Sequence, residues 1–198
     1  HELNGKVLGL VGLGHIGRRT AQLGQAFGMQ VLASDPYLDD DEIKARGGIP
    51  VSLDELLASS DIVSLHCPRI PETVGMFDTK AFQKMKRGAL FISTARGGIH
   101  DEAALYDALA VGHLAGAGLD VWQVEPPAAD HPLLSLSNVV STFHTAGVTH
   151  EGRKNVATMA AEQILAICSG NKPDRMINKA IYPKFSARLH AWRQHTYK

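Results

Sequence analysis

Cysteine is scarce in this sequence, which has two, Cys67 and Cys168, among 198 residues. They lie far apart and fit no metal-binding spacing, so we expect reduced thiols in a cytoplasmic protein. No stretch approaches 18 uninterrupted apolar residues, and the first residues lack the basic start and apolar run of a signal peptide. The sequence therefore predicts neither a membrane-spanning helix nor a secretory signal.

An excess of charge of either sign is also missing. Twenty Lys and Arg balance twenty Asp and Glu, so the formal net charge is zero at pH 7. This balance gives no electrostatic reason to expect nucleic acid or an anionic membrane as a partner. The ten histidines are scattered and form no H-x-x-x-H or H-E-x-x-H pattern, so we expect no metal site.

Short hydrophobic runs alternate with segments of helical periodicity along the chain. Alternating strand and helix units of this length predict an α/β fold, a Rossmann doubly wound parallel sheet with right-handed crossovers. The segment Ser52–Glu55 predicts a capping box at the start of a short helix. The part after Gly170 has no clean period and is expected to be a tail that packs on something else. The expected strands are 6–11, 29–33, 61–65, 89–93, 115–121 and 138–142, and the expected helices are 16–27, 53–58, 80–85, 101–110 and 150–168.

A glycine signature, GLGHIG, follows the first predicted strand and opens the first predicted helix. Gly12 permits a tight turn, Gly14 lets a pyrophosphate approach the backbone, and Gly17 lets helix and strand pack closely. The helix N-terminus adds free N–H groups for phosphates. Asp35 ends the second predicted strand, where a carboxylate can bind ribose hydroxyls and repel a 2′-phosphate. With no arginine beside it, the pattern predicts NAD, although Asp35-Pro36 could instead merely start a turn.

Polar residues follow the later predicted strands, at the edge where open α/β sheets bind ligands. Arg96 follows the fourth strand, Glu125 the fifth and His144 the sixth. We therefore expect these three side chains to converge beside a nicotinamide. Taken singly, each has an ordinary alternative as a surface arginine, a solvated loop carboxylate or a structural histidine.

Further motifs occur in one order along the chain: SLDELL, LHCP, PET, STARGG, DEAALYDAL, GHLAGAGLDVW, VEPPAADHPLL and FHTAG. Together with the glycine signature they cover nearly all of residues 3–150. The sequence resembles the D-isomer-specific 2-hydroxyacid dehydrogenase family, which includes phosphoglycerate dehydrogenases and hydroxypyruvate or glyoxylate reductases. The resemblance implies an NAD-dependent oxidoreductase that interconverts a small D-2-hydroxy acid and its 2-oxo acid by hydride transfer.

The resemblance implies three catalytic roles. Arg96 would hold the substrate carboxylate and polarise the keto oxygen, a task suited to a planar, permanently charged guanidinium. His144 would donate a proton during reduction and accept it during oxidation. Glu125 would bind the other ring nitrogen of His144 and fix its tautomer.

The resemblance also implies cofactor contacts that run from the phosphates through the adenosine to the nicotinamide. Asp120 is expected near the nicotinamide, where it could accept from the carboxamide. The whole expected set is Gly12, Gly14, His15, Ile16, Gly17, Asp35, Cys67, Pro68, Thr73, Thr94, Ala95, Asp120 and Gly147.

Two departures from the family pattern are visible. Phe143 stands where the family usually has proline before the catalytic histidine. The family also builds its substrate domain from residues before the nucleotide domain plus the end of the chain. We therefore expect an NAD-binding domain at 1–149, and at 150–198 the returning helix and C-terminal segment of a substrate domain whose N-terminal part is absent. Relatives dimerise through the nucleotide domain, so a homodimer is expected.

Two other functions remain as alternatives. A corepressor-like protein of the same fold would sense NAD(H) and dimerise without significant turnover, but neutral charge and the lack of a disordered interaction tail disfavour it. A methyltransferase with a similar glycine loop would leave Arg96, Glu125 and His144 unexplained. For the dehydrogenase, hydroxypyruvate, glyoxylate and 3-phosphoglycerate remain open as substrates.

Overall fold

The computed structural model describes residues 2–196, and the chain divides into two compact units. The first unit ends at Ala146 and the second begins at Gly147, a few residues before the predicted boundary. Each unit is described by itself. The assignment of the second unit to a substrate domain stays a prediction.

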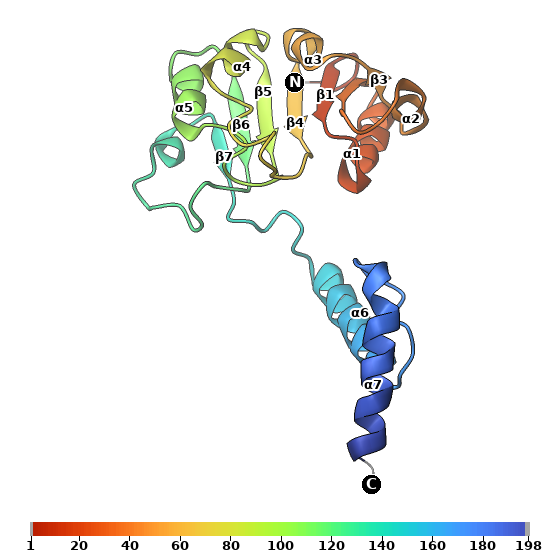
Figure 1. The fold of residues 1–198 in the computed structure, drawn as a ribbon. Helices are drawn as coiled ribbons and strands as arrows, with labels where there is room; N and C mark the ends of the chain where they lie inside the picture. The colour runs from red at the N-terminus through yellow and green to blue at the C-terminus, as the bar shows by residue number, and fades with distance from the viewer. Residues whose placement is uncertain (1, 197–198) are drawn as a thin grey trace. The chain divides into compact units, whose positions relative to one another are not determined.

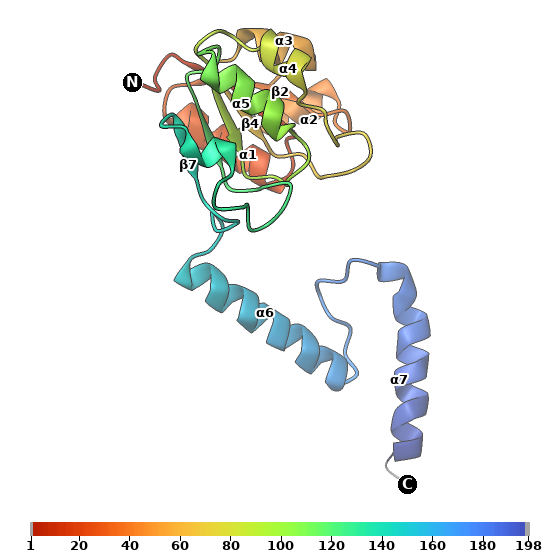
Figure 2. The ribbon, with the colours of Figure 1, turned by 90° about the vertical axis from the view of Figure 1, so that its left-hand side faces the viewer.

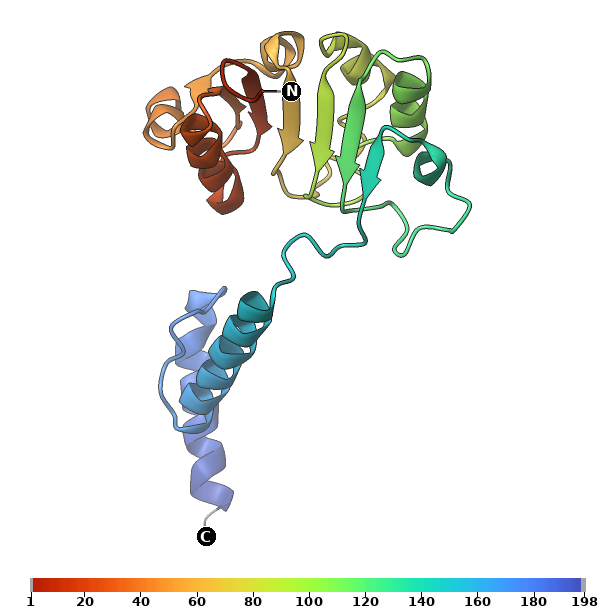
Figure 3. The same cartoon turned by 180° about the vertical axis from the view of Figure 1, so that it is seen from behind.

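A seven-stranded parallel sheet forms the first unit, in the order β3-β2-β1-β4-β5-β6-β7 (Figure 1). The predicted doubly wound fold is confirmed. The order reverses between β1 and β4, which is where ligands bind in such sheets. Figure 3 shows the arrowheads of β4 to β7 at one edge, the carboxyl edge. The strands are β1 (Val7–Val11), β2 (Gln30–Ser34), β3 (Ile49–Pro50), β4 (Ile62–Leu65), β5 (Leu90–Ser93), β6 (Gly116–Leu119) and β7 (Val139–Ser141).

Helices cover both faces of this sheet, and an apolar cluster on each face packs the helices against the strands. One cluster joins Val63 and Phe91 to α3, α4 and α5, and the other joins Leu10 and Val31 to α1 and α2. Parallel strands covered on both faces are apolar throughout, which explains the continuous hydrophobic runs of the sequence. The helices are α1 (His15–Ala26), α2 (Asp40–Ala45), α3 (Leu53–Ser59), α4 (Thr79–Lys84), α5 (Glu102–Ala110) and the 3-10 helix η1 (Pro132–Ser135).

The sequence prediction missed α2 and β3, but the predicted helix start at Ser52 is confirmed. The reciprocal capping box lies at Asp39 and Glu42, ahead of α2. At Ser52 only half of the predicted box is present among the described residues: the side chain accepts from the backbone N–H of Glu55, without a return bond from the Glu55 side chain. Both α2 and β3 are too short for periodicity to reveal them.

The second unit consists of α6 (His150–Cys168), the 3-10 turn η2 (Lys179–Ile181) and α7 (Tyr182–Thr196), with α6 and α7 as separate helices in Figure 2. The long helix was predicted with these bounds, but α7 was expected to be an irregular tail. Its Pro183 lies in the first helical turn, where proline is tolerated. No residue of α6 is buried in the described structure. Among the described helices, none has the length and apolar character needed to cross a membrane.

Candidate active site

The glycine loop between β1 and α1 has the geometry that a dinucleotide needs. Gly12 has φ +90°, and a Cβ there would lie 2.8 Å from the backbone nitrogen of Cys67. A Cβ on Gly17 would collide with the carbonyl oxygen of Gly12. Around Gly14, by contrast, no described atom lies within 4 Å of such a Cβ. The first and third glycines are therefore required by the protein's own packing, whereas the second leaves an open backbone face for a ligand.

Asp35 at the end of β2 is tied to this loop. Its Oδ2 accepts from the backbone N–H of Leu13 at 2.8 Å, and its Oδ1 accepts from that of Tyr37 at 3.0 Å. The carboxylate thus does hold its own turn, as the simpler alternative supposed. It also lines the same pocket as Gly12 and Gly14. Both functions of Asp35 are geometrically compatible, and the ribose contact stays a prediction.

A pocket of about 200 Å³ lies over the glycine loop, and we call it the glycine-loop pocket. Thr73 closes one side, where its hydroxyl donates to the carbonyl of Pro68 at 2.7 Å and accepts from the N–H of Ile70 at 2.9 Å. These bonds fix the loop after β4. The predicted cofactor residues that line the pocket are Gly12, Gly14, Asp35, Cys67, Pro68 and Thr73.

A second pocket, of about 570 Å³, shares His66, Cys67 and Pro68 with the first. We call it the arginine pocket, since Arg69 and Arg96 line it together with Ile16, Thr94 and Ala95. Burial lowers the pKa of His66 to about 4, so its ring is neutral at pH 7. The sequence reading missed Arg69. Its signal was a cation directly after Cys67-Pro68, at the carboxyl end of β4.

His144 and Glu125 form the closest pair of predicted catalytic groups. Nδ1 of His144 lies 2.7 Å from Oε2 of Glu125, whose Oε1 accepts from the backbone N–H of Trp122 at 3.0 Å. The hydrogen bond to His144 holds the pKa of Glu125 below its usual value. A carboxylate at Nδ1 selects the tautomer with hydrogen there, which leaves Nε2 for a reacting group. His144 and Glu125 are each part exposed, at 46% and 36% of the side-chain surface.

Asp120 holds the segment that carries His144. Its Oδ1 accepts from the hydroxyl of Thr142 at 2.6 Å and from the N–H of Thr145 at 2.7 Å, and Oδ2 accepts from the N–H of Ala146 at 3.0 Å. The backbone carbonyl of Asp120 also accepts from the N–H of His144 at 2.6 Å. Burial raises the pKa of Asp120, but these hydrogen bonds outweigh it and the pKa lies below its usual value. The predicted carboxamide contact of Asp120 stays a prediction.

A further pair, which the sequence reading missed, supports the loop that carries Glu125. Oε1 of Glu102 at the start of α5 accepts from the N–H of Gln123 at 2.7 Å, and Oε2 lies 3.1 Å from Nε2 of His131. The ring of His131 packs edge-on against Trp122. Both residues stand in motifs of the resemblance, DEAAL and HPLL, which is the signal that could have found them.

The remaining predicted residues are less closely grouped. His144 and Glu125 line neither the glycine-loop pocket nor the arginine pocket, and Nη1 of Arg96 donates to the carbonyl of Ala95 at 2.6 Å. His15 contacts Arg18 through its Nδ1, and Gly147 belongs to the second unit. The structure therefore brings Glu125 and His144 together, and Arg96 beside Thr94 and Ile16, while convergence of all three catalytic groups stays a prediction.

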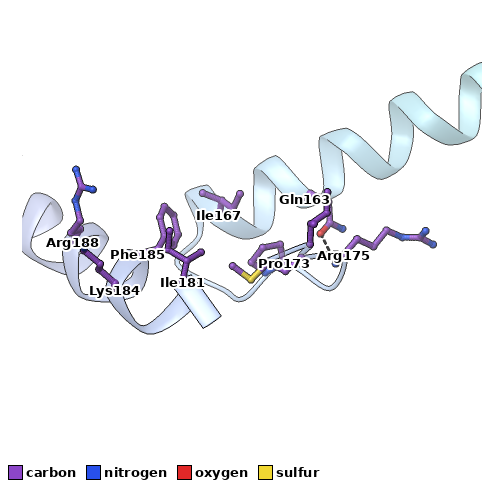
Figure 4. A pocket seen from close by; sticks show the side chains of 10 residues that line it. Gln163, Ile167, Pro173, Arg175, Ile181, Lys184, Phe185 and Arg188 are labelled. Atoms are coloured by element: carbon purple, nitrogen blue, oxygen red, sulfur yellow. Dashed lines mark hydrogen bonds between the residues drawn. The ribbon is translucent and has the colours of Figure 1, made fainter. Parts of the chain in front are cut away.

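One pocket lies within the second unit, between α6 and α7, with a volume of about 490 Å³. Ile167, Ile181 and Phe185 form its apolar part, and Lys184 and Arg188 lie on its rim (Figure 4). The side-chain oxygen of Gln163 accepts from the N–H of Arg175 across it at 3.0 Å. It contains none of the predicted site residues.

Comparison with known proteins is consistent with this geometry. Residues 1–146 match the family described as D-isomer specific 2-hydroxyacid dehydrogenase, NAD binding domain. The chain is 46% identical over 169 residues to a D-3-phosphoglycerate dehydrogenase of Archaeoglobus fulgidus, covering 85% of this chain and 32% of that protein. It is 41% identical over 181 residues to a glyoxylate reductase of Korarchaeum cryptofilum, covering 91% and 54%.

The fold is also similar to that of a solved dehydrogenase structure. D-lactate dehydrogenase with NAD⁺ from Lactobacillus jensenii superposes with a TM-score of 0.82 at 32% sequence identity, covering 90% of this chain and 57% of that one. The chain thus spans about a third to a half of the length of these relatives.

Proposed function

The chain belongs to the D-isomer specific 2-hydroxyacid dehydrogenase family and carries its NAD-binding domain, and from this premise we propose that the full-length gene product interconverts a small D-2-hydroxy acid and its 2-oxo acid. The observation that carries the proposal is the 2.7 Å contact between His144 Nδ1 and Glu125 Oε2. A histidine whose tautomer is fixed by a carboxylate is suited to general acid–base catalysis. A nucleotide-binding fold alone does not require it.

The reaction joins a 2-oxo acid, NADH and one proton to give a 2-hydroxy acid and NAD⁺. The bound cofactor supplies the hydride in this direction and accepts it in the other. Arg96 binds the substrate carboxylate through its planar guanidinium. His144 gives the proton from Nε2 to the substrate oxygen as the carbon is reduced, and takes it back in oxidation. Glu125 keeps the ring oriented in both directions.

The residues of the first unit fit NAD. The open backbone at Gly14 and the N-terminus of α1 would receive the pyrophosphate. Asp35 at the edge of the glycine-loop pocket would bind the ribose hydroxyls and repel a 2′-phosphate. Thr94 and Ala95 in the arginine pocket would lie toward the nicotinamide, and Ile16 in the same pocket would lie toward the phosphates.

The corepressor alternative receives no support from the relatives named above, which are dehydrogenases and reductases. A cytoplasmic homodimer is the assembly that we propose from the family resemblance, without nucleic acid or membrane as a partner. Light scattering with the purified protein tests this, since a monomeric mass would contradict it.

Absorbance at 340 nm tests the proposed activity. The full-length gene product is mixed with NADH and a panel of 2-oxo acids that includes glyoxylate, hydroxypyruvate and 3-phosphohydroxypyruvate. We expect oxidation of NADH with at least one acid and its loss in an Arg96→Leu variant. Tight NADH binding with no turnover on any acid would instead favour a sensor.

A further inference from the structure

Two guanidinium groups line the arginine pocket, and the proposed reaction has used only one of them. Arg69 comes from the loop after β4 and Arg96 from the loop after β5. No carboxylate is among the described residues that line this pocket, and His66 contributes no charge at pH 7. The lining therefore carries two positive charges without a negative one, and an anion of matching charge would relieve their repulsion.

Arg69 has all its donors available. It is exposed, and within residues 2–196 no hydrogen bond or ion pair engages its side chain. Arg46 shows the contrast, because it donates to the carbonyl of Leu13 at 3.0 Å and lies 3.7 Å from Glu42. A guanidinium offers five N–H donors in a fork that matches carboxylate or phosphate oxygens.

The absence of a side chain at Gly98 leaves room for the side chain of Arg69. A Cβ built on Gly98 would lie 3.4 Å from Cζ, from Nε and from Nη2 of Arg69. The guanidinium plane therefore lies next to the space that a side chain at position 98 would occupy. Gly98 has φ +78°, a conformation that favours glycine, and stands two positions after Arg96. Arg69 is thus held beside the loop from which Arg96 projects.

We propose that Arg69 forms a second anion subsite next to Arg96, and that the substrate is a 2-oxo or 2-hydroxy acid with a second acidic group, either phosphate or carboxylate. This inference rests on the proposed function, in which Arg96 holds the first carboxylate. Arg69 acts on binding and specificity and takes no part in proton transfer. A substrate with a single acidic group leaves Arg69 without a partner, so it is bound less tightly.

The test compares Arg69→Leu with wild type in the full-length gene product on 3-phosphohydroxypyruvate, oxaloacetate and glyoxylate. These probes carry a phosphate, a second carboxylate and no second acid, respectively. In Arg69→Leu, the loss of a hydrogen-bonded charge pair is expected to lower kcat/KM about 10- to 100-fold for the preferred substrate with two acidic groups. The change should lie mainly in KM. The kcat/KM for glyoxylate should stay the same. Arg69→Lys keeps the charge but loses the fork, and is expected to lie between the two. Arg87→Leu, which removes an exposed arginine that lines neither pocket, should change none of these values.

Three results would overturn the subsite. The first is an equal decrease of kcat/KM on all three substrates, and the second is no decrease on any of them. The third is weaker NADH binding in Arg69→Leu, which would assign Arg69 to the cofactor phosphates. If wild type turns over no acid, the proposed function fails on its own. The subsite is then decided by calorimetry with 3-phosphoglycerate and with oxaloacetate. Binding by wild type that Arg69→Leu weakens supports it, and equal binding or none contradicts it.

Discussion

The two ends of the sheet's carboxyl edge present ligand-binding groups in different ways. At the β1–β2 end, ligand binding depends on the absence of side chains in the glycine loop, because Gly14 leaves its backbone accessible to a ligand. At the β5–β7 end, the site depends on side chains, and the segment that carries His144 is held by Asp120, a residue more than twenty positions away that accepts from Thr142 and Thr145. The first end is built by one strand, turn and helix, whereas the second needs several loops to be in register. The difference predicts that substitutions at the first end alter cofactor affinity and those at the second alter turnover.

The largest effect should come from His144→Asn. His144 has φ 56°, and asparagine is among the residues that best tolerate this region, so the variant should fold. Removal of the acid–base group is expected to lower kcat by about 10²- to 10⁴-fold while NADH affinity stays the same. Stopped-flow or steady-state absorbance gives the rate and fluorescence titration gives the affinity. The exposed His150→Asn is the control, and an unchanged kcat in His144→Asn would remove this residue from the mechanism.

Asp120→Asn should lower both kcat and stability. The carboxylate accepts from three donors, and an amide would turn an NH₂ group toward one of the backbone N–H groups of Thr145 or Ala146. The loss of buried hydrogen bonds to a charge is expected to cost about 1–3 kcal/mol of the free energy of unfolding. Urea denaturation measures this, with the exposed Asp107→Asn as the matched variant. Full activity and stability would mean that Asp120 does not position His144.

A pair of glycine substitutions separates ligand binding from folding at the first end. Gly14→Ala meets no described atom, so the melting temperature should stay the same while NADH affinity falls at least about tenfold, or 1.4 kcal/mol. Gly17→Ala meets the carbonyl oxygen of Gly12 and should lower the melting temperature as well. Differential scanning fluorimetry with and without NADH reads both quantities. If Gly14→Ala bound NADH like wild type, the phosphates would not approach this backbone.

The smallest effect concerns His100, which lies between β5 and α5. The ring is 1% exposed, packs against Phe91, and has no hydrogen-bond partner at either nitrogen in the described structure. Burial lowers the pKa of His100 to about 4. The unfolded chain therefore binds a proton near pH 6.5 that the folded chain binds only near 4. Stability is unaffected above pH 6.5 and falls as the pH decreases from 6.5 to 4, by at most about 1.4 kcal/mol per unit.

His100→Leu should stabilise the protein by about 1 kcal/mol at pH 7, because it removes two buried ring nitrogens that have no hydrogen-bond partner in the described structure. It should also weaken the loss of stability between pH 6.5 and 4. Denaturant unfolding at pH 7 and pH 5 measures both changes. His113→Leu is the opposite control, because the ring of His113 lies 3.0 Å from the carbonyl of Phe82 and 3.1 Å from that of Met85, and both carbonyls would lose this hydrogen bond. A wild-type pH dependence in His100→Leu would show that this histidine is not the group responsible.

The sequence predicted the sheet well because buried parallel strands consist of continuous apolar runs between turns. It missed β3, which has two residues, and it missed α7, which lacks an apolar period and has no buried side chain at positions 182–191. It also placed the capping box at Ser52, because a pattern of side chains cannot show whether both bonds form. Asp39 and Glu42 form both.

For the site, residue type and chain order were sufficient to select Gly12, Gly14, Asp35 and Arg96 as residues that line the two pockets. They also selected Glu125 and His144, which the fold places in hydrogen-bond contact. The hydrogen-bond and packing partners of the site loops could not be predicted from the sequence. Nothing in the local sequence connects Glu102 to Gln123, or Arg69 to Gly98, since each pair joins segments that follow different strands.

The sequence by itself determined the βα alternation, the glycine signature and the order of the polar residues, because these depend on local periodicity and on steric requirements of single residues. Only the tertiary structure decided which side chains share a pocket and which carboxylate oxygens are already occupied. The physical reason is that hydrogen bonds and pockets depend on distances across the sheet edge, which arise when separate loops are brought together by burial of the strands between them.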